Sequence, residues 1–316
     1  MTKLLIARPA PDEVRAALAD FDVTYRDIDT PMSADEMRAA LRDYDGVLPT
    51  LGDAFSAELF AQVESPRCKI LANFGVGYNH IDAAAAKASG VQVSNTPGAV
   101  TDATADIGMT LMLMTARRAG EGERLVRSGA WTGWHPSQLL GMHLTGKTVG
   151  IVGMGRIGQA VAQRCHYGFS MPVKYFSRSA KDLPYEAEHI SDLKALVAAV
   201  DVVVIAVPGG DETHHLINAD VLAAMQPHGL LINIARGNII EESALIDALQ
   251  AGAIGGAGLD VYEFEPQVPD ALRALDNVVL LPHLGTASHE VRLNMWMMAV
   301  DNLKAGVAGQ TPPNAV

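Results

Sequence analysis

The chain has only two cysteines, Cys68 and Cys165, in 316 residues, and it has no long run of apolar residues. Two cysteines do not make the disulfide framework of a small secreted domain, and they fit a reducing compartment. The longest apolar stretch, residues 107–116, contains Gly and Thr and is too short to span a bilayer. The N-terminal apolar run is too short for a signal peptide. We therefore expect a cytoplasmic protein with no membrane partner.

Positive charge is also scarce, with 24 Lys and Arg against 36 Asp and Glu, which gives a net charge of −12. Nucleic acids and anionic membranes attract Lys and Arg, so this balance argues against both as partners. Hydrophobic residues make up 49% of the chain, as in soluble globular proteins. A chain of this length can form two domains with sizeable cores.

Strand-like and helix-like segments alternate through the first hundred residues, and a second such series begins at Thr148. Alternation of this kind is typical of a doubly wound parallel sheet. Long helical patterns over residues 101–127 and 287–306 follow the two series. The expected strands are Leu4–Ala7, Val23–Ile28, Gly46–Thr50, Ile70–Phe74 and Val91–Asn95, then Val149–Val152, Val173–Phe176, Val202–Val207, Leu230–Ile234, Gly256–Leu259 and Val278–Leu281.

A glycine-rich turn joins the first strand of the second series to the helical pattern that follows it. Gly153, Gly155 and Gly158 have the G-x-G-x-x-G spacing of a dinucleotide-binding turn. The first glycine permits the tight turn, the second lets the backbone approach a pyrophosphate, and the third lets the helix pack closely. The phosphates would rest on the free N–H groups of the helix N-terminus.

These patterns predict an α/β fold with two doubly wound parallel-sheet domains. We expect a Rossmann dinucleotide-binding domain at residues 99–285, inserted into a flavodoxin-like substrate domain made of residues 1–98 and 286–316. The long helical patterns would connect the domains, and the C-terminal one would return to the first domain.

The residues at the end of the expected strand Val173–Phe176 indicate which of the two nicotinamide cofactors, NAD(H) or NADP(H), the chain binds. Domains that bind NAD usually carry Asp or Glu there, to accept hydrogen bonds from the ribose 2′-hydroxyl. This chain has Ser177, Arg178 and Ser179 at that place. A carboxylate about 4 Å from a 2′-phosphate would oppose it by roughly 4 kcal/mol, whereas a guanidinium can grip a phosphate through two hydrogen bonds. We therefore expect NADP(H), as NADPH, over NAD(H).

Three ionisable residues lie just beyond strands of the second series, on the side where such folds bind ligands. They are Arg236, Glu265 and His283. His283 is suited to proton transfer near neutral pH. Glu265 would favour the charged imidazole and fix its orientation, and Arg236 would bind a carboxylate and polarise a carbonyl. The pair His214-His215 superficially suggests a metal site, but it lacks the usual zinc-ligand spacing, and we expect no metal.

Five segments together resemble the D-isomer-specific 2-hydroxyacid dehydrogenase family. They are the glycine turn and residues 73–82, 233–237, 258–266 and 282–287, in family order along nearly the whole chain. Within the family, the Ser-Arg-Ser segment and residues 131–136 are most similar to glyoxylate/hydroxypyruvate reductases. The resemblance implies that the backbone amides of Val76 and Gly77 hold the substrate carboxylate. It also implies a homodimer in which the loop bearing Trp134 reaches the active site of the partner subunit. There Trp134 would contact the substrate; a tryptophan simply packed in the dimer interface stays open.

The expected reaction is the NADPH-dependent reduction of small 2-oxo acids, glyoxylate and hydroxypyruvate, to glycolate and D-glycerate. A reductase of bulkier 2-oxo acids such as phenylpyruvate stays open, as does a nucleotide-sensing, corepressor-like binding protein without activity. Leu51 is a further candidate for lining the substrate pocket. Other cofactor contacts are expected at Arg156, Ile157, Val207, Pro208, Ile234, Asp260 and Gly285.

Overall fold

The computed structural model describes all residues 1–316, which form two compact units. Unit 1 consists of residues 1–100 and 287–316, and unit 2 of residues 101–286. Each unit has one sheet, and every strand pairing in both sheets is parallel. The fold class expected from the alternation of strand and helix patterns is therefore confirmed.

Unit 1 has a five-stranded sheet in the order β2-β1-β3-β4-β5, which is the flavodoxin-like order. The strands are β1 (Lys3–Ile6), β2 (Asp22–Tyr25), β3 (Gly46–Leu48), β4 (Ile70–Ala72) and β5 (Gln92–Ser94). The helices are α1 (Asp12–Ala17), α2 (Ala34–Asp43), α3 (Ala57–Ala61), α4 (Ala83–Ala88) and α12 (His289–Val307).

The long C-terminal helix α12 belongs to the core of unit 1. Trp296, Leu303 and Val307 pack in one cluster with Leu4 and Ile70 of the sheet. Ser288 begins the helix, and its hydroxyl accepts the N–H of Val291 at 3.4 Å. Helix α1 also contributes to this cluster, while α2, α3 and α4 supply residues to the other core cluster of the unit. Helices thus cover both faces of the sheet, as a doubly wound fold requires.

Unit 2 has a seven-stranded sheet in the order β12-β11-β10-β9-β6-β7-β8. All strands except β12 together reproduce the Rossmann order, in which the chain reverses direction across the sheet between β6 and β9. The strands are β6 (Val149–Val152), β7 (Val173–Phe176), β8 (Ala187–His189), β9 (Val202–Ile205), β10 (Leu230–Asn233), β11 (Gly256–Leu259) and β12 (Val278–Leu280). The helices are α5 (Thr101–Ala116), α6 (Ala119–Arg127), α7 (Arg156–Phe169), α8 (Leu193–Ala198), α9 (Ala219–Leu222), α10 (Glu242–Gln250) and α11 (Asp270–Arg273), with short 3₁₀ turns at η1 (Asp211–Thr213) and η2 (Gly237–Ile239).

The central strand β9 explains why its sequence is a continuous apolar run. Val202 and Val204 pack into one core cluster, and Val203 and Ile205 pack into the cluster on the opposite face. Side chains of a strand alternate between faces, so a strand covered by helices on both sides needs apolar residues at every position.

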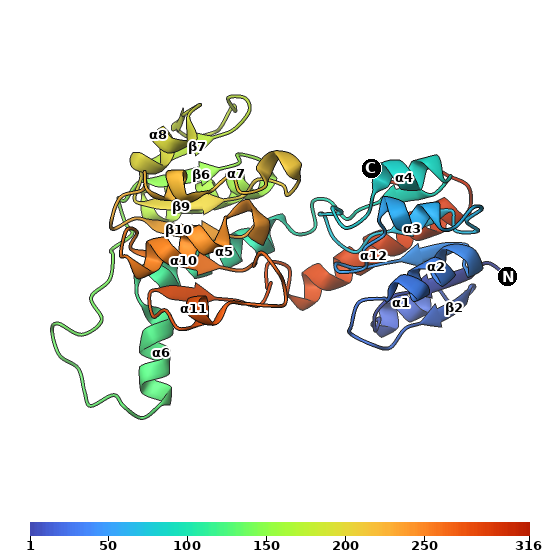
Figure 1. Cartoon of the computed structure of the whole chain (residues 1–316), viewed down its shortest axis with the longest axis horizontal. Helices are drawn as coiled ribbons and strands as arrows, with labels where there is room; N and C mark the ends of the chain where they lie inside the picture. Colours follow the sequence, from blue (N-terminus) through green and yellow to red (C-terminus); the bar gives the residue numbers. More distant parts are fainter. The chain divides into compact units, whose positions relative to one another are not determined.

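Several strands end one to three residues earlier than expected, and the structure differs from the expected elements more clearly in two places. The helical pattern over 101–127 is divided between α5 and α6 at Arg118, which is in the left-handed conformation at φ 51°. The helix stops because the carbonyl of Ala116 accepts the N–H of Met142 at 2.7 Å instead of continuing the helical ladder. Beyond α6, the chain projects away from the sheet before it returns to β6 (Figure 1). The edge strand β8, whose sequence is only partly apolar, was not expected.

Candidate active site

The glycine turn lies at the carboxyl end of β6 and leads into α7. Gly153 has φ +99°, and a Cβ there would lie 2.7 Å from the backbone nitrogen of Val207. A Cβ on Gly158 would lie 2.0 Å from the carbonyl oxygen of Gly153. Neither position can hold a larger residue, because its Cβ would overlap with these backbone atoms. The turn therefore keeps α7 close to the ends of β6 and β9.

The second glycine of the turn borders open space. Gly155 is exposed, and no atom lies within 4 Å of the position that a Cβ would take there. Arg156, Ile157 and Gly158 form the first turn of α7, where N–H groups have no partner within the helix. Free N–H groups beside an open glycine are what a dinucleotide pyrophosphate needs. The residues present thus fit a nicotinamide dinucleotide, which these positions would hold.

The Ser-Arg-Ser segment follows β7 directly, next to the glycine turn in the sheet. The Ser177 hydroxyl donates to the carbonyl of Ser179 at 2.6 Å, and the His189 ring lies 2.9 Å from the carbonyl of Ser177. These contacts fix the backbone of the segment. The Arg178 side chain is 93% exposed, and its guanidinium is 4.0 Å from the carboxylate of Glu212. An ion pair this long and this exposed contributes little stability, so the guanidinium is available to a ligand.

The other expected cofactor residues also lie past the carboxyl ends of strands in unit 2. Val207 and Pro208 follow β9, and Ile234 follows β10, where its side chain packs into the core. Asp260 follows β11 and is only 1% exposed. Its two carboxylate oxygens accept the N–H groups of Leu284 and Gly285 at 2.7 and 2.8 Å. Asp260 therefore holds the segment that follows β12.

Arg236 comes shortly after β10, on a turn that two neighbouring residues hold in place. The buried Asn233 accepts the N–H of Ala235 at 3.0 Å and donates to the carbonyl of Arg236 at 2.9 Å. A Cβ on Gly237 would lie 1.8 Å from the carbonyl carbon of Tyr262. Only glycine lets the two backbones come this close. The glycine after Arg236 thus brings the arginine beside the segment that carries Glu265.

His283 and Glu265 form a hydrogen-bonded pair, with Nδ1 of the ring 2.9 Å from Oε2 of the carboxylate. The side chains are 32% and 30% exposed. His283 is in the left-handed conformation at φ 57°, and its N–H donates to the carbonyl of Asp260 at 2.9 Å. Since Nδ1 faces the carboxylate, Nε2 is the ring nitrogen left to face a ligand.

Electrostatics couple the three ionisable residues. Burial raises the pKa of Glu265, but the hydrogen bond and charge of His283, the N–H of Tyr262 and the charge of Arg236 together bring it below its usual value. Burial lowers the pKa of Arg236, and the charge of Glu265 opposes that effect. A carboxylate between an imidazole and a guanidinium is thus held in its ionised form. The structure brings together the three residues that the sequence placed at separate strand ends.

The candidate substrate residues outside this cluster lie in two places. Val76 and Gly77 are in unit 1, in the loop after β4, where their carbonyls accept the side-chain amides of Asn95 and Asn73 at 2.9 and 3.2 Å. No hydrogen bond within the chain uses the N–H groups of Val76 and Gly77. Two free N–H groups in succession can bind a carboxylate.

Leu51 and Trp134 are both on exposed turns. Leu51 follows β3 in unit 1 and is 46% exposed. Trp134 is in the irregular segment between α6 and β6 of unit 2 and is 80% exposed. Within unit 2, Trp134 makes no hydrogen bond or ring contact with the three ionisable residues of the cluster.

Tyr262 is a residue of this site that the sequence did not indicate. Its backbone N–H donates to Oε1 of Glu265 at 3.0 Å, and its hydroxyl donates to the carbonyl of Leu281 at 2.8 Å. It therefore ties together the two segments that carry Glu265 and His283. Its one sequence signal is an aromatic residue between the strand and Glu265, which also fits simple core packing.

Comparison with known proteins agrees with this geometry. The sequence profile described as "D-isomer specific 2-hydroxyacid dehydrogenase, NAD binding domain" matches residues 109–285. A glyoxylate reductase of Pyrococcus horikoshii is 45% identical over 273 residues, which cover 84% of this chain and 80% of that protein.

Solved structures are similar over the whole chain. A protein of Thermus thermophilus has a TM-score of 0.92 at 40% identity, with 100% of both chains covered. An NADPH-dependent glyoxylate/hydroxypyruvate reductase of Sinorhizobium meliloti, in complex with NADP and malonate, has a TM-score of 0.88 at 36% identity, covering 100% of this chain and 96% of that one.

The chain belongs to the D-isomer specific 2-hydroxyacid dehydrogenase family. It is an oxidoreductase with a nicotinamide cofactor, which confirms the class expected from the sequence. None of its helices is both long enough and apolar enough to cross a membrane.

Proposed function

We propose that this chain catalyses the NADPH-dependent reduction of glyoxylate and hydroxypyruvate to glycolate and D-glycerate. The observation that carries the proposal is the hydrogen-bonded pair of His283 and Glu265 beside the charge of Arg236. The relatives named glyoxylate reductase and glyoxylate/hydroxypyruvate reductase support the substrate class. The overall reaction consumes one 2-oxo acid, one NADPH and one proton, and gives one 2-hydroxy acid and NADP⁺.

The chemistry that a reduced nicotinamide supplies when bound is hydride transfer to the carbonyl carbon. His283 would donate the proton to the ketone oxygen from Nε2, because Nδ1 is held by Glu265. Glu265 would stabilise the protonated ring and fix its orientation. Arg236 would bind the substrate carboxylate and stabilise negative charge on the ketone oxygen.

The proposal gives Val76 and Gly77 a second contact with the substrate carboxylate, through their free N–H groups. Leu51 would line the substrate pocket. As the family resemblance implies, the chain would act as a homodimer in which Trp134 narrows the active site of the partner subunit. Trp134 is 80% exposed, so its side chain is accessible to another molecule.

The preference for NADPH rests on Arg178. The side chain is exposed, next to the glycine turn in the sheet, and Ser177 and Ser179 stand where NAD enzymes carry a carboxylate. The complex of the Sinorhizobium meliloti relative with NADP supports the same preference.

A panel assay tests the proposal. Purified protein is mixed with glyoxylate, hydroxypyruvate or phenylpyruvate and with NADPH or NADH, and the loss of nicotinamide absorbance is followed. We expect the highest kcat/KM with NADPH and the two small acids. A preference for phenylpyruvate would favour the bulkier substrate class, and tight NADPH binding with no turnover on any 2-oxo acid would favour a nucleotide sensor.

An Arg178→Ala variant tests the cofactor preference separately. A lost charge-assisted phosphate contact of roughly 1.5–3 kcal/mol corresponds to about a 10- to 150-fold rise in KM for NADPH. The KM for NADH should change little, because NADH has no 2′-phosphate. Equal effects on the two cofactors would show that Arg178 does not recognise the 2′-phosphate.

A further inference from the structure

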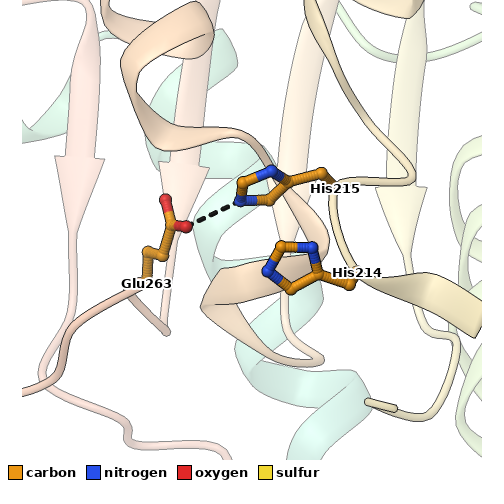
Figure 2. A group of neighbouring side chains, drawn as sticks. All are labelled: His214, His215 and Glu263. Carbon is orange, nitrogen blue, oxygen red and sulfur yellow. Dashed lines mark hydrogen bonds and ion pairs between the residues drawn. The ribbon is translucent and has the colours of Figure 1, made fainter. Parts of the chain in front are cut away.

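A second cluster of side chains, all of types that can bind a metal ion, lies apart from Arg236, Glu265 and His283. His214 and His215 follow the turn η1, and Glu263 follows β11, 48 residues beyond His215. One donor atom from each of the three lies within 4.8 Å of the others. The imidazole rings are stacked, with centroids 3.9 Å apart and planes at 27° (Figure 2). Nε2 of His215 is 2.6 Å from Oε1 of Glu263.

The backbone holds this arrangement. Consecutive side chains of an extended segment point to opposite sides. His215 instead has φ 48°, in the left-handed region, and its N–H donates to the carbonyl of Asn238 at 2.9 Å. This conformation brings its ring beside that of His214. Histidine is one of the residues that adopt the left-handed region more often than most.

Glu263 is fixed from its other side. Its Oε2 accepts the N–H of Glu242 at 3.2 Å, and its own N–H donates to Oε1 of Glu242 at 3.0 Å. The Glu263 side chain is 12% exposed. Oε2 of Glu242, a residue only 7% exposed, is buried with no hydrogen-bond partner. Glu242 thus holds the Glu263 carboxylate in place, with Oε1 directed to His215.

The donor set fits zinc. Imidazole nitrogen and carboxylate oxygen bind Zn²⁺ at about 2.0–2.2 Å, so tetrahedral neighbours lie roughly 3.3–3.5 Å apart. The donor atoms of the three residues are separated by 2.6 Å at the closest and by no more than 4.8 Å, a range that includes this spacing. His214 is exposed, so its ring can turn toward the other two donors without disturbing the core.

We propose that His214, His215 and Glu263 form a binding site for Zn²⁺, with water as the fourth ligand. Two adjacent histidines alone have no zinc-ligand spacing, and only the fold supplies the third donor. The ion would tie the turn after β9 to the segment after β11, two residues before Glu265. Since the three donors come together only in the folded chain, bound zinc would also stabilise unit 2.

The test measures zinc binding to the full chain, purified without a histidine tag and stripped with a chelator. Isothermal titration with ZnCl₂ should give one ion per chain, and the melting temperature should rise when zinc is added. His214→Asn should weaken binding by at least about tenfold, since even loss of an outer contact to a metal ligand costs that much. His214 is exposed and makes no hydrogen bond in the core, so this variant should fold as the parent does. Glu263→Gln should weaken binding as well.

His289→Asn is the matched control, because His289 is an exposed histidine at the start of α12 in unit 1. It should leave the stoichiometry and affinity unchanged. Absence of zinc binding, or binding that His214→Asn and Glu263→Gln leave intact, would overturn the proposal. So would equal weakening by His289→Asn, which would indicate adventitious binding to surface histidines. None of these readouts uses reductase activity, so the result is independent of the proposed reaction.

Discussion

Replacing Gly237 with alanine should damage both the stability of unit 2 and its activity. The added Cβ would lie 1.8 Å from the carbonyl carbon and 1.9 Å from the carbonyl oxygen of Tyr262. An ordinary carbon–carbon contact is about 3.5–4.0 Å, so one backbone must move by roughly 1.5–2 Å. Both partners are backbone, and no flexible side chain can give way.

The magnitude follows from this overlap. Overpacking a buried site typically costs about 1–3 kcal/mol, and a backbone clash falls at the upper end. For a unit of this size, each kcal/mol lowers the melting temperature by roughly 2–4 °C, so we expect a loss of about 5–10 °C. Arg236 moves with Gly237, and a displacement of about 1 Å at this proposed substrate contact can cost around a hundredfold in rate.

The assay compares Gly237→Ala with Gly168→Ala by thermal unfolding and by kcat/KM for glyoxylate. Gly168 is inside α7, and no atom lies within 4 Å of the position of its added Cβ. Alanine there should be neutral or stabilise by up to about 1 kcal/mol, because glycine is a poor helix former. Wild-type stability and activity in Gly237→Ala would refute the close approach of the two segments.

Two other predictions concern buried groups. Asp260→Asn should lower the free energy of unfolding by about 1–3 kcal/mol, because the amide NH₂ would replace one of the two oxygens that accept the N–H groups of Leu284 and Gly285. An unchanged midpoint in a urea titration would contradict this role of Asp260. Cys68 and Cys165 should resist thiol reagents in the native protein, since burial raises the pKa of each thiol to about 12. Ellman's reagent should label both only after denaturation, and rapid labelling of the native chain would show that the thiols are accessible.

The parts of the fold that the sequence predicts are those that periodicity controls. The run from Val202 to Ile205 is apolar at every position because β9 is buried on both faces, so its strand was recognisable. Strand β8 was not expected because it is an edge strand with Ala187 and His189 half-buried and Glu188 exposed. Such a strand needs no apolar pattern.

The break between α5 and α6 was equally hidden from local pattern. It depends on the hydrogen bond from Met142 to the carbonyl of Ala116, two residues that lie far apart in the sequence. The helix propensity of residues 101–127 does not depend on this tertiary contact, and here the contact overrides the propensity.

The site divides in the same way. Arg236, Glu265 and His283 were recognisable because each follows a parallel strand, and such strand ends meet at one edge of a sheet. The partnership of His215 with Glu263 and the double role of Tyr262 were not, because they depend on backbone approach between distant segments. The spacing of residues along the chain does not predict such contacts.

The most direct test of the proposed chemistry is the turnover of His283→Asn with NADPH and glyoxylate. Loss of a general acid costs about 10²- to 10⁴-fold, so kcat should fall at least a hundredfold while NADPH still binds. A variant that oxidises NADPH at the wild-type rate would contradict the assignment of His283 as the proton donor.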